Sequence, residues 1–541
     1  MAKTEAVPVR ADYIVVGAGS AGTVIATRLS EDPAVRVLLI EAGGESNGFM
    51  VQMPVGFAKM IAKDRYDWMY EQVPDASIGG RKFLWSAGKM LGGGSSLNGQ
   101  VFIRGTRADY DRWPTLGAAG WGFDDVLPYF RKLEQWHGAP DQARGAHGPL
   151  SVSPMRDPHP LCQVFLEACR EAGLPTIDDY NAGEMEGAFL TQASQRDGWR
   201  CSTEKAYLRP ARSRPNLTVL TNAEVSGVRI ESGRAVGVTL VRGGERYEVA
   251  TDREVIVSAG AMGSPALLMR SGLGPEAHLR EHGIAVVQDM SGVGGGLQEH
   301  CGVTQNKRVS VPTLNSQTGA LDMIRHMAKF LWSRSGPMSA PAVQAMGLIR
   351  TRPDLDEPDV QIHFMPLAYN VEADTVSSAE AVMPKEPAIS INATTCHPRS
   401  RGRIVLGEGG RPRVEHQLLG DRRDIETMIG ALKAVDRIFR TPAMQRIVVG
   451  DREPPRPPAD DADWEAYLHA KAMVVYHPAG TCRIGADDGA VVDPQCRVRG
   501  VQALRVVDAS VIPALPSGNT NAPVIMIGEK AADMIRSGRA G

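Results

Sequence analysis

A glycine-rich segment near the N-terminus is the feature that most constrains the fold of this chain. Ile14–Val16 is typical of a buried strand, and it is followed by Gly17, Gly19 and Gly22 and then by an apolar helical stretch. Gly17 permits a tight turn, Gly19 lets the backbone approach a diphosphate, and Gly22 allows a helix to pack closely on the strand. The segment therefore predicts a Rossmann-like βαβ unit that binds a dinucleotide.

The residues around this turn suggest how the nucleotide is held. Ser20 and Ala21 fall in the first turn of the expected helix, where free N–H groups and the helix dipole favour a phosphate. Glu41 stands nineteen positions after Gly22, at the end of the second strand, with Ala42 beside it. Its carboxylate can accept hydrogen bonds from ribose hydroxyls. An acid at this position disfavours NADP and leaves NAD or FAD.

Length and composition narrow the protein class. A chain of 541 residues is expected to form two or more domains. A formal charge of −2 gives no reason to expect nucleic acid as a partner. No apolar run is long enough for a transmembrane segment, although peripheral contact with a membrane is compatible with the sequence. Seven cysteines without a C-x-x-C pair favour the cytoplasm, and twelve histidines without ligand spacing predict no metal site.

The middle of the chain predicts a second unit. Residues 216–257 alternate as strands separated by short turns, and further strands are expected at Val360–Met365, Ala388–Ala393 and Gly402–Leu406, followed by a helix at Arg423–Phe439. We expect an α/β fold that combines a Rossmann-like domain with a discontinuous α+β substrate domain on an antiparallel sheet. The Rossmann-like domain is assigned residues 1–160, 206–310 and 466–541, and the substrate domain residues 161–205 and 311–465.

Two segments near the C-terminus carry further polar residues. One contains His477 within Tyr476-His477-Pro478, and the other contains Asn521 shortly before Pro523. Proline favours the first helical position, so Asn521 is expected to lie just before a helix N-terminus, which stabilises negative charge on a ligand.

The motifs together resemble the glucose–methanol–choline (GMC) oxidoreductase family, near its choline-dehydrogenase-like and sorbose-dehydrogenase-like bacterial members. The resemblance covers essentially the whole chain. It rests on the first glycine-rich turn, on the two C-terminal segments, and on three further motifs at residues 88–99, 260–272 and 296–300.

The resemblance implies FAD as the cofactor. Members with covalent flavin carry histidine where this chain has Leu97, so attachment is expected to be non-covalent. The residues implied for the ADP half are Gly17, Gly19, Ser20, Ala21, Gly22, Glu41 and Ala42, with Val225 at the adenine. Those implied along the rest of the cofactor are Gly92, Asn98, Gly99, Asp508, Ala509, Asn521 and Pro523.

The resemblance also implies that His477 and Asn521 form the active-site pair. Imidazole can accept the hydroxyl proton of an alcohol while hydride leaves for flavin N5. Gln344 occupies the position of a glutamate that pairs with the ammonium group in choline dehydrogenases, so the sequence predicts a neutral primary alcohol. The pocket is expected to contain Gln344, Phe364, Met365 and Tyr476.

Several alternatives remain at this level. The electron acceptor is oxygen or a quinone. A flavin-containing lyase of the cyanohydrin type would use the same histidine without flavin turnover. An NAD-dependent enzyme and a nucleotide-binding protein without redox chemistry are the other interpretations of the glycine-rich turn.

Overall fold

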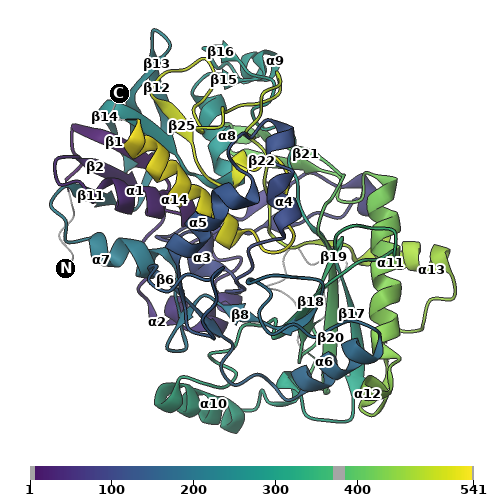
Figure 1. Cartoon of the computed structure of the whole chain (residues 1–541). Helices are drawn as coiled ribbons and strands as arrows, with labels where there is room; N and C mark the ends of the chain where they lie inside the picture. The colour runs from purple at the N-terminus through teal and green to yellow at the C-terminus, as the bar shows by residue number, and fades with distance from the viewer. Residues whose placement is uncertain (1–5, 370–383, 539–541) are drawn as a thin grey trace.

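A computed structural model describes residues 6–369 and 384–538 of the chain, and two large sheets dominate it (Figure 1). Residues 370–383, within the range assigned to the substrate domain, lie outside this description. The first sheet has the order β11-β2-β1-β14-β13-β12, with β25 pairing to β14. Its parallel part consists of β11 (Leu217–Leu220), β2 (Val37–Ile40), β1 (Arg10–Val16), the C-terminal half of β14 (Glu245–Val257), and β25 (Leu504–Val506).

The long strand β14 joins this parallel part to an antiparallel meander. Its N-terminal half pairs with β13 (Arg234–Arg242), which pairs in turn with β12 (Ala223–Glu231). These strands confirm the alternation predicted for residues 216–257. The helix α1 (Ser20–Leu29) follows β1, and a Cβ atom built on Gly22 would lie 2.0 Å from the carbonyl oxygen of Gly17. Glycine is therefore required at this position for helix α1 to leave the strand as closely as it does.

The second sheet is antiparallel, with the order β23-β17-β20-β19-β18-β7 and β24 on β17. Its strands are β7 (Gly187–Leu190), β17 (Cys301–Val309), β18 (Ala345–Ile349), β19 (Val360–Met365), β20 (Ala388–Thr395), β23 (Val448–Glu453) and β24 (Met473–Val474). The helices α6 (Leu161–Glu171) and α11 (Arg422–Phe439) cover one of its faces (Figure 1). The predicted α/β fold with a second antiparallel unit is confirmed.

The boundaries differ from the expected ones in three places. β17 and β24 belong to the second sheet although residues 301–309 and 473–474 were assigned to the nucleotide domain. Helix α14 (Asn521–Ser537) begins at Asn521, so Pro523 is its third residue and not its first. Proline is tolerated there because the N–H groups of the first turn have no partner within the helix. Among the described helices, none has the length and apolar character needed to cross a membrane.

Candidate active site

Two glycine-rich loops and two helix N-termini form one cradle. The N–H of Gly92 donates to the carbonyl of Ala18 at 2.7 Å, and a Cβ atom on Gly93 would lie 2.7 Å from the Cα of Gly19. By contrast, Cβ atoms on Gly94 and Gly99 would meet nothing within 4 Å. The second loop therefore presses against the first and leaves backbone exposed to a space in which a flat ligand fits.

The helices α1 and α14 meet at this cradle. Ser20 Oγ donates to Asn521 Oδ1 at 2.8 Å, which ties the first residues of the two helices together. Neither helix has a side-chain cap at its N-terminus. Their free N–H groups and dipoles therefore favour a negatively charged group at one place. This arrangement fits the diphosphate of a dinucleotide such as FAD.

Glu41, the residue expected at a ribose, lies beside the first glycine-rich turn. Its Oε2 accepts from the N–H of Ala18 at 2.9 Å and its Oε1 from the N–H of Gly43 at 2.8 Å. Each oxygen keeps a lone pair with which it can accept a ribose hydroxyl. Burial raises the pKa of Glu41 to about 7, although the two backbone donors oppose this shift.

The other residues implied for the cofactor fall into two groups. Asp508 is buried, and its carboxylate accepts from Ser264, Ser510 and the N–H of Gly260, so its side chain holds loops together. The carbonyl of Ala509 accepts from the N–H of Gly480 in the loop after His477.

Nearer the flavin end, Asn98 Oδ1 accepts from Arg200 and from the N–H of Gln100. Leu97 is buried in a small apolar cluster. At the adenine end, the carbonyl of Val225 accepts from Arg270 at 3.3 Å.

A buried carboxyl group, that of Glu299, binds the backbone just before His477. Glu299 accepts the N–H of His477 at 2.9 Å and that of Val475 at 3.2 Å. Tyr476 between them has φ of +65°, a conformation that is unfavourable for a non-glycine residue. Burial raises the pKa of Glu299 to about 8 against the effect of these donors. Glu299 thus fixes the position from which His477 enters the site.

The imidazole of His477 lies in a chain of hydrogen bonds that sets its tautomer. His300 Nε2 lies 3.0 Å from the carbonyl oxygen of Cys396, which can only accept, so this nitrogen carries a proton. Neutral His300 then accepts at Nδ1, which lies 3.0 Å from Nδ1 of His477. His477 must therefore donate at Nδ1, and its Nε2 keeps a lone pair. This nitrogen faces the amide of Asn519 at 3.0 Å.

Burial keeps the histidines of this site neutral. It lowers the pKa of His300 to about 3 and that of His363, on β19, to about 4. Burial, together with the neighbouring His300 and His363, holds the pKa of His477 well below its usual range. The site thus offers a neutral imidazole as a proton acceptor. Because His363 belongs to β19, the second sheet borders the site.

The structure brings Asn519, and not Asn521, to His477. Asn521 is engaged with Ser20, whereas Asn519 Oδ1 is buried and has no hydrogen-bond partner within the described residues. Sequence reasoning missed Asn519 and His300. Asn519 lies only two positions before Asn521, and His300 ends a motif already attributed to the family. The motifs that contain both residues were therefore recognised, but no role was predicted for either residue.

The expected pocket residues separate. Phe364 stacks on Phe165 of α6 with ring centroids 4.8 Å apart, so it lies on the helix-covered face of the sheet. Gln344 Oε1 accepts the N–H of His159 at 2.9 Å, just before α6. Met365, the next residue of β19, points to the opposite face, which it shares with His363. Tyr476 is half-buried beside His477.

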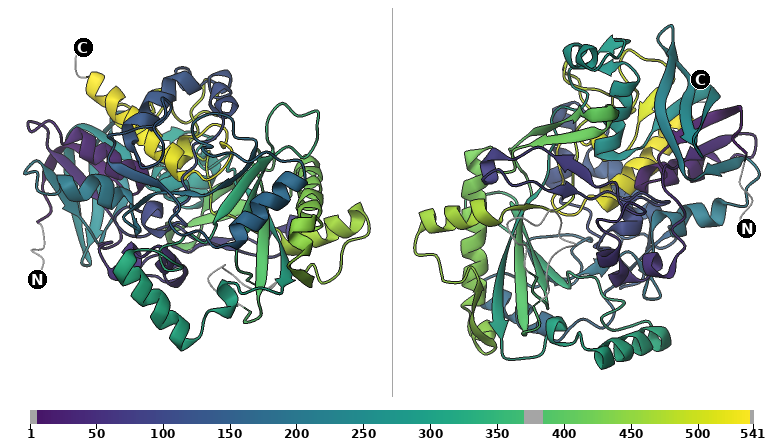
Figure 2. Two further views of the ribbon diagram at one scale, coloured as in Figure 1. Left: turned by 60° about the horizontal axis from the view of Figure 1, so that its bottom comes forward. Right: turned by 180° about the vertical axis from the view of Figure 1, so that it is seen from behind.

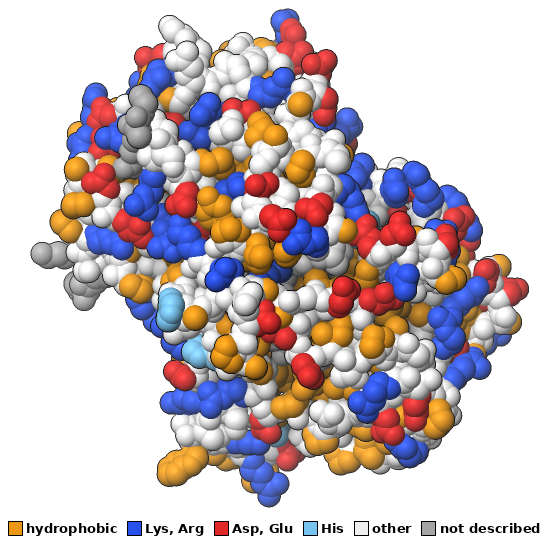
Figure 3. All heavy atoms as spheres, in the orientation of Figure 1, with side chains coloured by type: hydrophobic (Ala, Val, Ile, Leu, Met, Phe, Trp, Pro, Cys, Tyr) orange, Lys and Arg blue, Asp and Glu red, His pale blue; other side chains and the backbone are white. Residues whose placement is uncertain are grey.

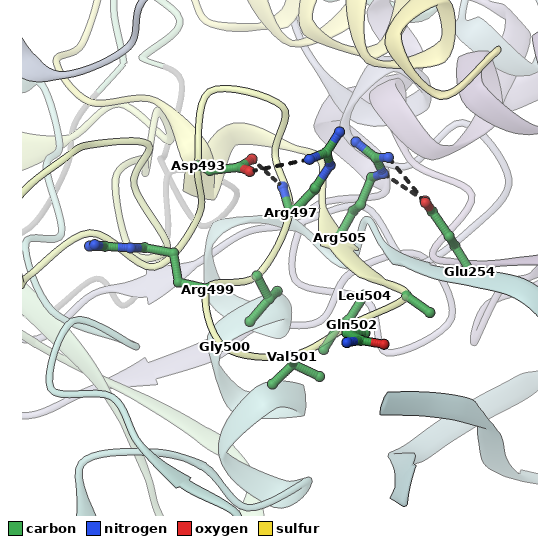
Figure 4. Close-up of a pocket in the computed structure, with 11 residues that line it drawn as sticks. Glu254, Asp493, Arg497, Arg499, Gly500, Val501, Gln502, Leu504 and Arg505 are labelled. Carbon is green, nitrogen blue, oxygen red and sulfur yellow. Dashed lines mark hydrogen bonds and ion pairs between the residues drawn. The ribbon is translucent and has the colours of Figure 1, made fainter. Parts of the chain in front are cut away.

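A surface pocket of about 400 Å³ elsewhere does not compete with this site (Figure 4). None of the residues described at the cradle or at His477 lines it. Two ion pairs line it, Arg505 with Glu254 at 2.6 Å and Arg497 with Asp493 at 4.0 Å, and Arg499 donates to the carbonyl of Asp487. The His477 region is the better candidate because Asn519 Oδ1 is without a hydrogen-bond partner among the described residues and the pKa values of His300, His363 and His477 are lowered there.

Comparison with known proteins places this geometry in a family. The sequence models of the GMC oxidoreductase family match residues 11–302 and 398–528. An oxygen-dependent choline dehydrogenase of Photobacterium profundum is 36% identical over 532 residues, which are 97% of this chain and 92% of that protein. The mitochondrial choline dehydrogenase of Mus musculus is 38% identical over 537 residues, 97% of this chain and 89% of that protein.

Among solved structures, pyridoxine 4-oxidase from Mesorbium loti superposes with a TM-score of 0.88 at 30% identity, covering 97% of this chain and 99% of its own. The matches confirm the predicted FAD cofactor and the predicted enzyme class, an FAD-dependent alcohol dehydrogenase or oxidase. Non-covalent attachment stays a prediction. The chain belongs to the GMC oxidoreductase family.

Proposed function

We propose that this enzyme oxidises a small, uncharged primary alcohol to the aldehyde, with His477 as the base and Asn519 as the residue that orients the alcohol oxygen. The observation that carries this proposal is the hydrogen-bond chain through His300, which leaves Nε2 of His477 as an acceptor. Asn519 takes the role that the sequence suggested for Asn521.

FAD, when bound, supplies the hydride acceptor of the reaction. The chain's own residues bind and orient the alcohol and move its proton. The alcohol hydroxyl takes the place of the Asn519 amide at Nε2 of His477, which accepts the hydroxyl proton, while Nδ1 keeps its hydrogen bond to His300. Asn519 Nδ2 can donate to the substrate oxygen, and its unpartnered Oδ1 is a further acceptor in the site. The N-terminus of α14 would favour negative charge on the bound cofactor, on its diphosphate and on its reduced ring system.

Several observations favour a neutral substrate. Glu299 is the carboxyl group nearest to His477 along the described hydrogen bonds, and its oxygens accept backbone N–H groups. The sheet face beside His477 carries His363, Asn392 and Thr304, which are uncharged at neutral pH. Choline is the substrate named for the relatives, and the proposal distinguishes this chain from them. The acceptor is oxygen or a quinone.

Anaerobic stopped-flow reduction of the flavin by a panel of alcohols tests the proposal. His477→Ala should slow reduction by about 10²–10⁴-fold, because a general base is lost. Asn519→Ala should also slow reduction, by about tenfold or more, whereas its matched control Asn521→Ala should chiefly weaken FAD retention. Acid precipitation should release the flavin, since Leu97 cannot link it covalently.

Two outcomes would contradict the proposal. Reduction of the His477→Ala variant at the parental rate would remove this residue as the base. A larger rate loss in Asn521→Ala than in Asn519→Ala, at equal FAD content, would return the orienting role to Asn521. Substrate turnover without any flavin bleaching would favour the lyase, which none of the relatives named above represents.

A further inference from the structure

The helix α10 (Ala320–Ser333) has an unusual environment. Of its fourteen residues only Phe330 is buried, whereas α11 buries ten of eighteen. Phe330 packs edge-on against Trp199 with ring centroids 4.8 Å apart, and Phe49 lies next to both rings. The views of Figures 1 and 2 agree that α10 stands at the margin of the molecule, below the rest of the fold in Figure 1. An isolated helix of this length is only marginally stable in water, so contact of its other faces with a partner would stabilise it.

The outward side of α10 carries an apolar stripe. The exposed fractions are 70% for Leu321, 65% for Ile324, 51% for Leu331 and 93% for Trp332. At about 100° per residue these four positions and Ala328 fall within an arc of about 100°, on the side of the helix away from Phe330. This outer stripe, defined as residues 321, 324, 328, 331 and 332, is therefore not part of the protein core.

Basic residues border the outer stripe. Residues 320–334 contain Arg325, Lys329 and Arg334 against Asp322. The guanidinium of Arg334 lies over the inner rings of Trp199 and Phe330, so Arg325 and Lys329 are the basic residues beside the stripe. Arg325 and Lys329 are 79% and 50% exposed and follow one edge of the stripe. Lys329 pairs with Asp157 at 2.5 Å and Arg325 lies 3.9 Å from Asp322, so Arg325 is the less strongly paired of the two. Orange and blue side chains meet at the lower margin of the molecule in Figure 3, where α10 lies. Apolar residues beside basic ones are complementary to a surface with an apolar interior and negatively charged groups at its boundary with water.

We propose that α10 docks the enzyme on an anionic lipid bilayer, with the outer stripe in the interface and Arg325 and Lys329 at the headgroups. Leucine, isoleucine and tryptophan on one face and basic residues at its edge are the features of interfacial helices. A second copy of the chain fits less well. A helix of fourteen residues is about 21 Å long and about 10 Å wide. It thus offers far less than the roughly 800 Å² per partner of a stable dimer.

Membrane docking is a property beyond the proposed reaction, and it can be measured by vesicle binding without any assay of alcohol oxidation. FAD-loaded enzyme is sedimented with vesicles of phosphatidylcholine alone and of phosphatidylcholine with phosphatidylglycerol. We expect binding to the mixed vesicles, with a blue shift of tryptophan emission as Trp332 enters the interface. The variant I324Q/L331Q/W332Q should bind at least about tenfold more weakly. The matched control V241Q/V287Q/V449Q removes valines that are 41%, 49% and 63% exposed elsewhere, and it should bind as the parent does.

The charge component is tested by R325Q/K329Q, which should reduce the preference for phosphatidylglycerol several-fold and make binding less sensitive to salt. All variants should reduce a soluble dye with alcohol at the parental rate, which confirms that they are folded. If the triple variant does not fold, W332Q alone replaces it, because this side chain is 93% exposed. Equal binding of parent and stripe variant, or no binding at low salt, would overturn the proposal. Self-association that the stripe variant abolishes would assign the surface to a second copy.

Discussion

The two faces of the second sheet are both buried, yet they differ in chemistry. The face covered by α6 and α11 is apolar, with Val303, Ile391 and Ile362 all completely buried. The opposite face carries Thr304, Asn392 and His363 at the corresponding places in the same three strands. A buried polar group costs free energy unless it is hydrogen-bonded. The polar face is therefore explained by the site it confronts and not by the stability of the sheet.

Hydrogen bonds along the polar face support this view. Asn392 Nδ2 donates to Thr304 Oγ1 at 2.9 Å, and Thr394 Oγ1 donates to Asn392 Oδ1 at 2.7 Å. His363 lies in the next strand and faces His477 closely enough to affect its pKa. On the apolar face, Gln305 is a polar exception: its Nε2 donates to the carbonyl of Leu432 in α11 at 2.7 Å, and its Oε1 has no partner among the described residues. The comparison predicts that one face governs stability and the other governs reaction.

The largest expected effect is on the apolar face. Phe364→Ala removes a ring stacked on Phe165 and should lower the free energy of unfolding by about 3–5 kcal/mol, as for other buried phenylalanines. Its neighbour Met365→Ala, on the polar face, should cost less and should change KM for the alcohol. Chemical denaturation gives the free energies, and flavin reduction gives the kinetics. A slowed flavin-reduction step in folded Phe364→Ala would break the division between the faces.

A smaller effect concerns pH. His363 has a pKa of about 4 in the folded protein against 6.5 ordinarily, so the unfolded chain binds more protons between these values. The contribution of neutral His363 to the free energy of unfolding should be fully present above pH 6.5. It should fall by about 2 kcal/mol as the pH decreases from about 6.5 to 5. His363→Asn should remove that part of the acid loss, whereas His147→Asn, at an exposed position, should not. An unchanged acid limb in His363→Asn would show that His363 is not buried as a neutral ring.

The smallest effect is expected at Gln344. Its Oε1 is the atom in use, accepting from the N–H of His159 and from the Cys162 thiol, so Gln344→Glu keeps both bonds. Because Gln344 is buried, glutamate should be held there as the neutral acid, so at about pH 5 we expect a change of about 1 kcal/mol in the free energy of unfolding and little change in the preference for neutral alcohols over choline. Gln361→Glu is the matched control. This residue is also buried, but on the polar face, and its Oε1 has no partner among the described residues. A large gain in choline turnover by Gln344→Glu would place this side chain in the substrate pocket.

Much of the fold could be predicted because its signals are local. The glycines at 17, 19 and 22 dictate a strand–turn–helix unit whatever surrounds them, and the structure has that unit. The strand at Val360–Met365 was expected with its observed bounds, and the helix at Arg423–Phe439 within one residue. His477 was identified as the candidate base because its motif fits a known family.

The sequence alone therefore determined the first nucleotide-binding turn and many strands of the two sheets, since glycine conformations and hydrophobic periods act over a few residues, and the family motif suggested His477 as the candidate base. Only the tertiary structure decided that Asn519 and not Asn521 meets His477, that His300 sets its tautomer, and that Phe364 turns away from the site. These choices depend on the direction in which α14 enters and on which face of a strand is covered. Both are fixed by the packing of segments hundreds of residues apart, and no local pattern specifies that packing.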